Sequence, residues 1–407
     1  MEKSLLLCLL LFTAYGYVLA HYNSPEPLVS TVSKNPILPI FTFTLNTNEE
    51  FFIHIGGPYI VRKCTDGLPR PIIPCGSPAC ATTRRVNPYQ CPPTQNTIIN
   101  GRCACKATVF EPFQRICNSD QFTYGGSLSM STLNPRSPSV TFNNLYYLCI
   151  PKPFLRDFPP VVFGLMGLAP TALAGWNQLT PPRLGLEKKF ALCLPSDENP
   201  TNKGAIYIGG GPYKFRNIDA RSMLSYTRLI KNPRKLNGYF LRLKGISVNE
   251  KPILLAQNAF DFDDKSDGGV TLSTVTFFTT LRSDIYKVFV EAFSQATSDI
   301  PRVKSTTPFE FCLKSATTPF QVPRIDLKLA DGTIWKLFTA NSMKKISADV
   351  SCLAFVNGGD TAEHAVVIGM HQMENTLLEF DVGRSAFGFS CSLGLVNASC
   401  GDFQTRL

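Results

Sequence analysis

The stretch FFIHIGGPYIVRKC, from Phe51 to Cys64, decides how the rest of the chain can fold. An apolar run meets a Gly-Gly-Pro turn, and a second apolar run follows. Glycine and proline at this point predict a tight turn between two strands. Just before it, Phe41, Phe43 and Leu45 alternate with polar residues, which predicts another strand and therefore a hairpin.

The composition extends this prediction to the whole chain. The 407 residues include 28 glycines, 31 prolines and 30 phenylalanines, with few helical patterns, which is typical of an all-β architecture. A chain of this length is too long for one core, so two lobes are expected. The clearest helix is predicted at Ser283–Ala296, with Ser283 as N-cap and one apolar face made of Ile285, Val288, Phe289 and Phe293.

The first 20 residues predict a secretory signal peptide. Lys3 precedes an apolar core at Leu5–Phe12, and Val18 and Ala20 fit the −3 and −1 positions of a cleavage site. That core is too short to span a bilayer, and no later apolar run reaches about 18 residues. We therefore expect a secreted chain that starts near His21 and has no membrane partner.

Cysteine usage indicates an oxidising compartment. Of the 14 cysteines, Cys8 leaves with the signal, and the remaining odd number predicts disulfides with one free thiol. Cys103-Ala104-Cys105 lacks zinc-ligand spacing and paired histidines. The acidic cluster Asp261, Asp263, Asp264 and Asp267 lacks EF-hand spacing, so a solvated turn is expected there. We expect no metal and no cofactor.

The net charge of +10 comes from scattered basic residues. No arginine-rich or aromatic-interleaved run suggests nucleic-acid binding. Diffuse positive charge favours an acidic partner or polyanionic surroundings, or is simply a soluble basic surface.

Several motifs, in order along nearly the whole mature chain, resemble those of pepsin-like aspartic proteases. They are Val162–Leu168, Ile208–Gly210, Gly245–Val248, Val367–Gly369, Phe380-Asp381 and Gly388-Phe389. The resemblance implies an all-β, bilobal pepsin-like fold with a few short helices. It implies an N-terminal lobe at 21–210 and a C-terminal lobe at 211–407.

The two loops that carry the catalytic aspartates of that family differ here. The family has Asp-Thr-Gly or Asp-Ser-Gly twice, whereas this chain has His54 in the first loop and Ser273 in the second. The proteolytic mechanism needs two carboxylates that share one proton. The degenerate dyad therefore predicts no proteolysis.

A narrower resemblance is to the plant xylanase-inhibitor-like group, which includes extracellular dermal glycoproteins and basic seed globulins. It rests on the Gly-Gly-Pro turn, the cysteine-dense first lobe and Ser273-Thr274. It implies disulfides Cys312–Cys352 and Cys193–Cys400, and leaves Cys391 as the free thiol. Twelve cysteines match the group: Cys64, Cys75, Cys80, Cys91, Cys103, Cys105, Cys117, Cys149, Cys193, Cys312, Cys352 and Cys400.

The sequence also departs from this group. Val61 replaces its usual tryptophan, and residues 395–399 lack the histidine or arginine that precedes the last cysteine in inhibitors. Asn397-Ala398-Ser399 is the N-x-S/T sequon, so Asn397 is a possible glycosylation site. His364 and His371 are interpreted as ordinary loop residues rather than ligands.

The leading hypothesis is a secreted, proteolytically inactive protein of the apoplast or cell wall that binds another protein, such as a microbial glycoside hydrolase. One alternative is an active aspartic-type endopeptidase. A second pairs His54 as base with Ser273 as nucleophile. A third is a storage or carbohydrate-binding wall protein.

Overall fold

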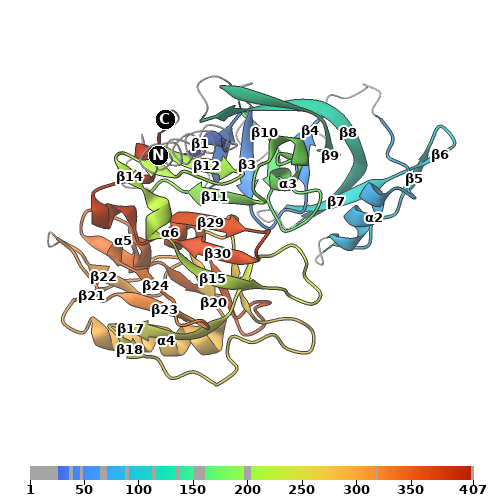
Figure 1. Cartoon of the computed structure of the whole chain (residues 1–407). Coiled ribbons are helices and arrows are strands. Elements are labelled where there is room, and N and C mark those ends of the chain that lie inside the picture. Colours follow the sequence, from blue (N-terminus) through green and yellow to red (C-terminus); the bar gives the residue numbers. More distant parts are fainter. Residues whose placement is uncertain are drawn as a thin grey trace, which may run out of the picture.

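The computed structural model describes residues 26–35, 40–45, 49–64, 71–87, 91–111, 116–133, 138–150, 161–196, 203–316 and 319–404. The predicted signal peptide at 1–20 lies outside these ranges. Within them, two groups of strands form two lobes joined by a shared sheet, with few helices (Figure 1). The prediction of an all-β, bilobal pepsin-like fold is confirmed. The names first lobe and second lobe follow the proposed boundary after residue 210.

The largest sheet has 18 strands in the described part of the chain. They are β1 (Leu28–Lys34), β2 (Phe41–Thr44), β3 (Glu50–His54), β4 (Ile60–Lys63), β7 (Lys106–Glu111), β8 (Ile116–Thr132), β9 (Ser139–Ile150), β10 (Val162–Gly167), β11 (Lys189–Cys193), β12 (Gly204–Ile208), β15 (Ser225–Ile230), β16 (Phe240–Leu241), β19 (Val270–Leu272), β20 (Thr279–Leu281), β27 (Phe355–Asn357), β28 (Val366–Ile368), β29 (Leu377–Asp381) and β30 (Ala386–Phe389).

The described part of the chain also contains four smaller sheets. Two are two-stranded: β5 (Thr97–Ile99) with β6 (Arg102–Ala104), and β13 (Lys214–Phe215) with β14 (Ile218–Asp219). Two are four-stranded and belong to the second lobe. One contains β17 (Leu243–Val248), β18 (Lys251–Pro252), β23 (Ile325–Leu329) and β24 (Ile334–Leu337), and the other contains β21 (Arg302–Val303), β22 (Cys312–Lys314), β25 (Met343–Lys345) and β26 (Val350–Leu353).

The described helices are short, apart from one. They are α2 (Pro78–Arg85), α3 (Gly175–Gln178), α4 (Ser283–Ala296), α5 (Thr339–Ser342) and α6 (Met370–Met373), with 3-10 turns η2 (Pro182–Leu184), η3 (Ala220–Met223), η4 (Leu393–Val396) and η5 (Cys400–Asp402). None of the helices in the described ranges is long and apolar enough to cross a membrane.

The predicted hairpin at the start of the chain is confirmed. β2 and β3 pair antiparallel with Phe43 opposite Phe51, and both side chains are buried. β3 then ends at His54, and the chain turns through Gly56 and Gly57 into β4. Both faces of β3 are buried, because Phe51 and Ile53 belong to one hydrophobic cluster and Phe52, pointing the other way, belongs to another.

The two lobes share one sheet at their junction. β11 of the first lobe pairs on one side with β12 and on the other with β29 of the second lobe. Phe190 of β11 stacks on Phe380 of β29, with ring centroids 4.7 Å apart. In Figure 1 these strands lie side by side between the two groups of strands, so the lobes are joined by backbone hydrogen bonds and a common core.

Helix α4 has the predicted bounds, but two details of the prediction are wrong. The N-cap is Arg282, and Ser283 is the first helical residue. The Ser283 hydroxyl donates to Asn357 Oδ1 over 2.8 Å. Val288 is 37% exposed, because it lies outside the stripe formed by Ile285, Phe289 and Phe293.

The structure contains the predicted disulfide framework. The bridges are Cys64–Cys149, Cys75–Cys103, Cys80–Cys105, Cys91–Cys117, Cys193–Cys400 and Cys312–Cys352. The twelve predicted cysteines and the two pairings implied by the resemblance are thus confirmed. Cys391 is a free, exposed thiol, also as predicted. Six disulfide bridges are typical of extracellular proteins, because disulfides form and persist in oxidising surroundings.

The cysteine-dense region is more regular than the sequence suggested. Helix α2 and strands β5 to β7 lie within a stretch that shows no strong period. The helix begins with Ser77, whose side chain accepts the N–H of Cys80 over 3.2 Å, and with Pro78 in the first turn. Serine followed by proline is a helix-start signal that could have located α2 from the sequence.

Candidate functional site

The two lobes present matching loops to one another. In the first lobe, β3 runs parallel to β10 with His54 opposite Gly167. In the second lobe, β19 runs parallel to β28, and the N–H of Ser273 donates to Ile368 O over 3.0 Å. His54 and Ser273 therefore occupy equivalent positions, each at the carboxyl end of the strand that leads into its loop.

A glycine on the neighbouring strand makes room for each loop. A Cβ atom at Gly167 would lie 2.2 Å from Tyr59 O and 2.5 Å from Gly57 O. A Cβ atom at Gly369 would lie 2.7 Å from Phe277 O. Both loops thus pass over a backbone that no side chain larger than hydrogen would permit, which explains the glycines in the predicted apolar-apolar-Gly segments.

One buried threonine ties the two loops together. Thr274 Oγ1 donates to Ile53 O over 2.7 Å and accepts the N–H of Ile55 over 3.1 Å. The reciprocal bonds cannot form, because Ile55 stands at the equivalent place in the first loop and has no hydroxyl group. The clasp is therefore one-sided, yet it brings His54 and Ser273 to the same cleft.

The His54 ring lies against its own turn. An added Cβ atom on Gly57 would be 3.1 Å from His54 Nδ1, and the ring of Phe52 lies nearly parallel with centroids 6.2 Å apart. Burial lowers the pKa of His54 to about 4. The imidazole is consequently neutral at ordinary pH and carries no charge into the cleft.

The Ser273 hydroxyl is used inside its own loop. It donates to Thr276 Oγ1 over 3.0 Å and accepts the N–H groups of Val275 and Thr276 over 3.2 and 3.1 Å. This is a local turn stabilised by the serine side chain. Since its single proton points to Thr276, Ser273 is not arranged as a nucleophile activated by His54.

The cleft around these loops is a cavity of about 320 Å³ lined by both lobes. Phe110 of β7, Arg85 of α2 and residues 234–238 contribute to its walls, together with Glu363 and His364. Glu363 is the acidic residue among the residues that line this cavity. Burial raises the pKa of Glu363 to about 7, and Lys235 Nζ, 2.7 Å from Oε1, opposes that shift by favouring the charged form.

A single carboxylate of this kind does not make a dyad. Glu363 pairs with Lys235, and its Oε1 also lies 3.3 Å from Nε2 of His364. No group of three or more His, Cys, Asp or Glu side chains in the described ranges is placed to hold a metal ion. At the two loop ends the cleft therefore has the neutral imidazole of His54 and the hydrogen-bonded hydroxyl of Ser273, and its wall carries the paired carboxylate of Glu363.

Other predicted residues lie away from this cleft, apart from His364. His364 lies in a bend before β28, as predicted, but the interpretation of His371 as a loop residue is wrong. His371 lies in α6, is buried, and its Nε2 is 3.0 Å from Met343 O. Asn397 is exposed at the end of η4 with a left-handed φ of 55°.

Sequence reasoning missed the residues that connect the lobes. Thr274 was adjacent to a predicted site residue, but its partners are about 220 positions away. Asn237, whose Nδ2 donates to Val86 O over 2.9 Å, also bridges the lobes. A short stretch with three basic residues, Lys231, Arg234 and Lys235, lies nearby in the sequence.

The fold and the facing loops define a pepsin-like protein. Residues 69–210 match the family model described as xylanase inhibitor N-terminal, and residues 238–391 match the model described as xylanase inhibitor C-terminal. The chain therefore belongs to the xylanase-inhibitor-type family of pepsin-like proteins.

Relatives carry varied names. The chain is 28% identical to "Probable aspartic proteinase GIP2" of Nicotiana benthamiana, over 93% of this chain and 88% of that one. It is 29% identical to "Chitinase CLP" of Oryza sativa subsp. japonica, over 94% and 92%. It is 31% identical to "Gamma conglutin 1" of Prunus dulcis, over 66% and 62%.

Solved structures agree with the fold. The chain in "Crystal structure of edgp" superposes with a TM-score of 0.82 at 25% identity, covering 94% of this chain and 98% of that one. The soybean basic 7S globulin superposes with a TM-score of 0.75 at 24% identity, covering 94% and 99%, which supports the fold alone.

Proposed function

We propose that the protein is a proteolytically inactive member of this family. The observation that carries the proposal is the pair of side chains at the two loop ends, His54 and Ser273. Proteolysis by this fold needs one carboxylate to accept a proton from water and another to donate one. A neutral imidazole and a hydroxyl bonded to Thr276 cannot replace two carboxylates that share one proton.

The proposed activity is binding of another protein, of the glycoside hydrolase class. The family models that match both lobes are named for xylanase inhibition, which supports a protein ligand of this kind. The basic net charge suits such a partner, because glycoside hydrolases use paired carboxylates in an open cleft. The apoplast or cell wall is the proposed location, reached through the signal peptide at 1–20.

Two assays test the two halves of this proposal separately. Incubation with a denatured protein substrate at acid pH, with pepsin as positive control, is expected to give no pepstatin-sensitive cleavage. Such cleavage would overturn the inactive assignment and support the endopeptidase named in some relatives.

The second assay measures binding. Immobilised protein is titrated with xylanases, β-glucanases and polygalacturonases from microbes, and a saturable one-to-one complex with at least one enzyme is expected. If none of them binds, the glycoside hydrolase partner is wrong even where the proteolysis assay is negative.

N-terminal sequencing of protein from wall fluid tests the proposed signal peptide. The sequence read is expected to start near His21.

A further inference from the structure

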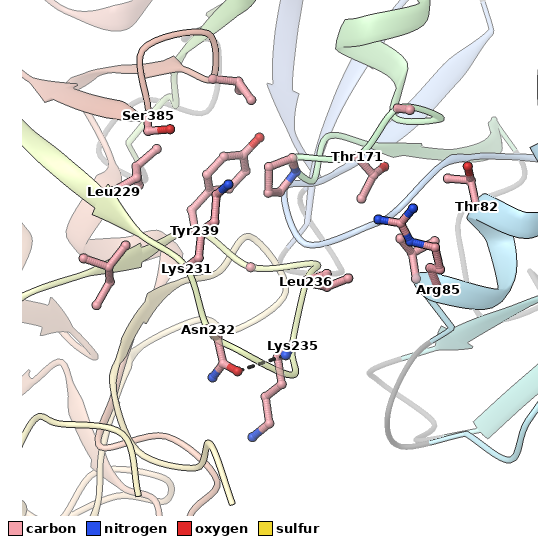
Figure 2. Close-up of a pocket in the computed structure, with 16 residues that line it drawn as sticks. Thr82, Arg85, Thr171, Leu229, Lys231, Asn232, Lys235, Leu236, Tyr239 and Ser385 are labelled. Atoms are coloured by element: carbon pink, nitrogen blue, oxygen red, sulfur yellow. Dashed lines mark hydrogen bonds between the residues drawn. The ribbon is translucent and has the colours of Figure 1, made fainter. Parts of the chain in front are cut away.

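A second cavity lies between the lobes, next to the cleft of the two loops. Its volume is about 340 Å³, which is within the range of small-molecule sites. Figure 2 shows Thr82, Arg85 and Thr171 of the first lobe on one side, with Leu229, Lys231 and Ser385 of the second lobe on the other. Five residues line both cavities and form their common wall: Arg85, Val86, Lys235, Leu236 and Gly238.

The walls of the second cavity are mostly apolar. Pro170, Leu229, Ile230, Tyr239 and Val382 line it, and Leu236 adds a side chain that is 42% exposed at the edge. An exposed leucine beside an apolar cavity leaves hydrocarbon surface that a ligand can cover. Covering it is favourable by about 25 cal/mol per Å² of apolar surface.

Three of the neutral polar side chains that line this cavity are already hydrogen-bonded within the protein. Tyr239 OH donates to Leu168 O over 2.6 Å, and the Thr82 hydroxyl donates to Pro78 O over 3.0 Å. The Asn232 amide donates to Ser266 O over 2.8 Å and accepts the backbone N–H groups of residues 234 and 235. These groups hold the walls in place and have little capacity left for a ligand.

The charges at the rim have one sign. The lining residues include Arg85, Lys231 and Lys235 and no carboxylate. Lys235 is neutralised by Asp267 and Glu363, which lie 2.5 and 2.7 Å from its Nζ. Arg85 and Lys231 are both exposed, and in the part of the chain that the structure describes neither forms an ion pair. Two positive charges therefore line an apolar cavity, Arg85 from the first lobe and Lys231 from the second lobe (Figure 2).

We propose that this cavity binds a small amphipathic anion, with an aromatic or aliphatic body between the lobes and a carboxylate or sulfonate at Arg85 and Lys231. The apolar body accounts for the walls. The anionic group would be bound by the two cations, since a guanidinium donates two parallel N–H groups that match the two oxygens of a carboxylate. This site goes beyond the protein-binding role and does not depend on it.

The test uses a fluorescent probe pair on the full mature chain. The anionic probe is 1-anilinonaphthalene-8-sulfonate, and its matched neutral analogue is N-phenyl-1-naphthylamine, which has the same apolar body without the sulfonate. We expect the anionic probe to bind saturably with one site per chain, and the neutral analogue to bind about tenfold more weakly or less.

Three variants locate the site. The double variant Arg85→Gln/Lys231→Gln is expected to bind the anionic probe about tenfold more weakly and to keep its affinity for the neutral probe. Ala172→Trp, at an exposed residue of the cavity wall, is expected to abolish binding of both by filling the space. Lys251→Gln/Lys304→Gln removes two exposed charges elsewhere and is expected to change nothing. Thermal unfolding of each variant verifies that it is folded.

Two results would overturn the proposal. One is equal affinity of the two probes for the unmodified protein. The other is unchanged affinity of the anionic probe in a folded Ala172→Trp variant, which would place its binding elsewhere on the surface.

Discussion

At the scale of single residues, Thr274 does more to define the site than either residue at the degenerate positions. It lies at the centre of the loop pair and is fully buried. His54 and Ser273 could be named from the sequence, because the resemblance to pepsin-like proteases leads one to expect another residue type at each position. Thr274 could not, because its role depends on two backbone groups in the other lobe.

Replacing Thr274 with valine is expected to destabilise the protein by about 1–3 kcal/mol. Valine keeps the shape but leaves the buried N–H of Ile55 and the carbonyl of Ile53 without their partner. Urea unfolding measures the loss. Thr280→Val is the matched control, since its hydroxyl makes one long bond of 3.3 Å in its own lobe, and it is expected to change stability by less than about 0.5 kcal/mol. Equal losses would show that the clasp adds nothing.

His54 is expected to make stability fall in acid. Its pKa is about 4 in the folded protein and about 6.5 in the unfolded chain. Between these values the unfolded chain binds the extra proton, so the free energy of unfolding decreases as the pH falls from 6.5 towards 4.

The matching variant is His54→Leu, which removes this titration. Between pH 7 and pH 4 the free energy of unfolding of this variant is expected to decrease by about 1–3 kcal/mol less than that of the unmodified protein. His364, whose pKa burial also lowers to about 4, leaves a residual pH dependence in both. Identical pH profiles of the two proteins would contradict the shifted pKa of His54.

At the scale of elements, local patterns predicted what local contacts decide. The hairpin of β2 and β3 and the helix α4 follow directly from periods of two and of about four in the sequence. The sequence placed Val288 on the wrong face, because a helical stripe is only resolved by what packs against it. It also missed α2, although Ser77 and Pro78 form a helix-start signal there, and Cys80 of this helix is disulfide-bonded to Cys105.

The crossing of β10 beneath the first loop leads to a sharp prediction. Gly167→Ala would place its Cβ atom 2.2 Å from Tyr59 O, and backbone cannot move away as a flexible side chain can. A loss of roughly 3 kcal/mol or more is expected. Gly76→Ala, where no atom lies within 4 Å of the added Cβ, is expected to be neutral or slightly stabilising. Differential scanning fluorimetry on the pair measures the contrast, and similar melting temperatures would contradict the close crossing.

At the scale of the whole molecule, the sequence predicted two lobes and the order of motifs but not how charge is buried between them. Lys189 on β11 lies 3.1 Å from Asp381 and 3.5 Å from Glu379, both on β29. Burial opposes its charge, yet these carboxylates and Glu187 raise the pKa of Lys189. Tyr213 OH donates to Glu379 over 2.6 Å, which completes the network. Such a cluster assembles from distant segments, so no sequence window contains it.

Lys189→Met is expected to cost about 3–5 kcal/mol at neutral pH, because two buried carboxylates lose their counter-charge. Lys188→Met, at the exposed neighbouring residue, is the control and is expected to lie within about 0.5 kcal/mol of the unmodified protein. Chemical unfolding at pH 7 measures both variants, and equal losses of the two would contradict the charge argument.

The pairing of β11 with β29 has a consequence for cooperativity. Because this pairing and the stacked rings of Phe190 and Phe380 belong to both lobes, neither lobe can unfold without exposing a strand edge and core of the other. A 407-residue chain with two lobes would ordinarily melt in two steps. This protein is instead expected to show one calorimetric transition, and an isolated lobe is expected to aggregate through the unpaired edge of β11 or β29.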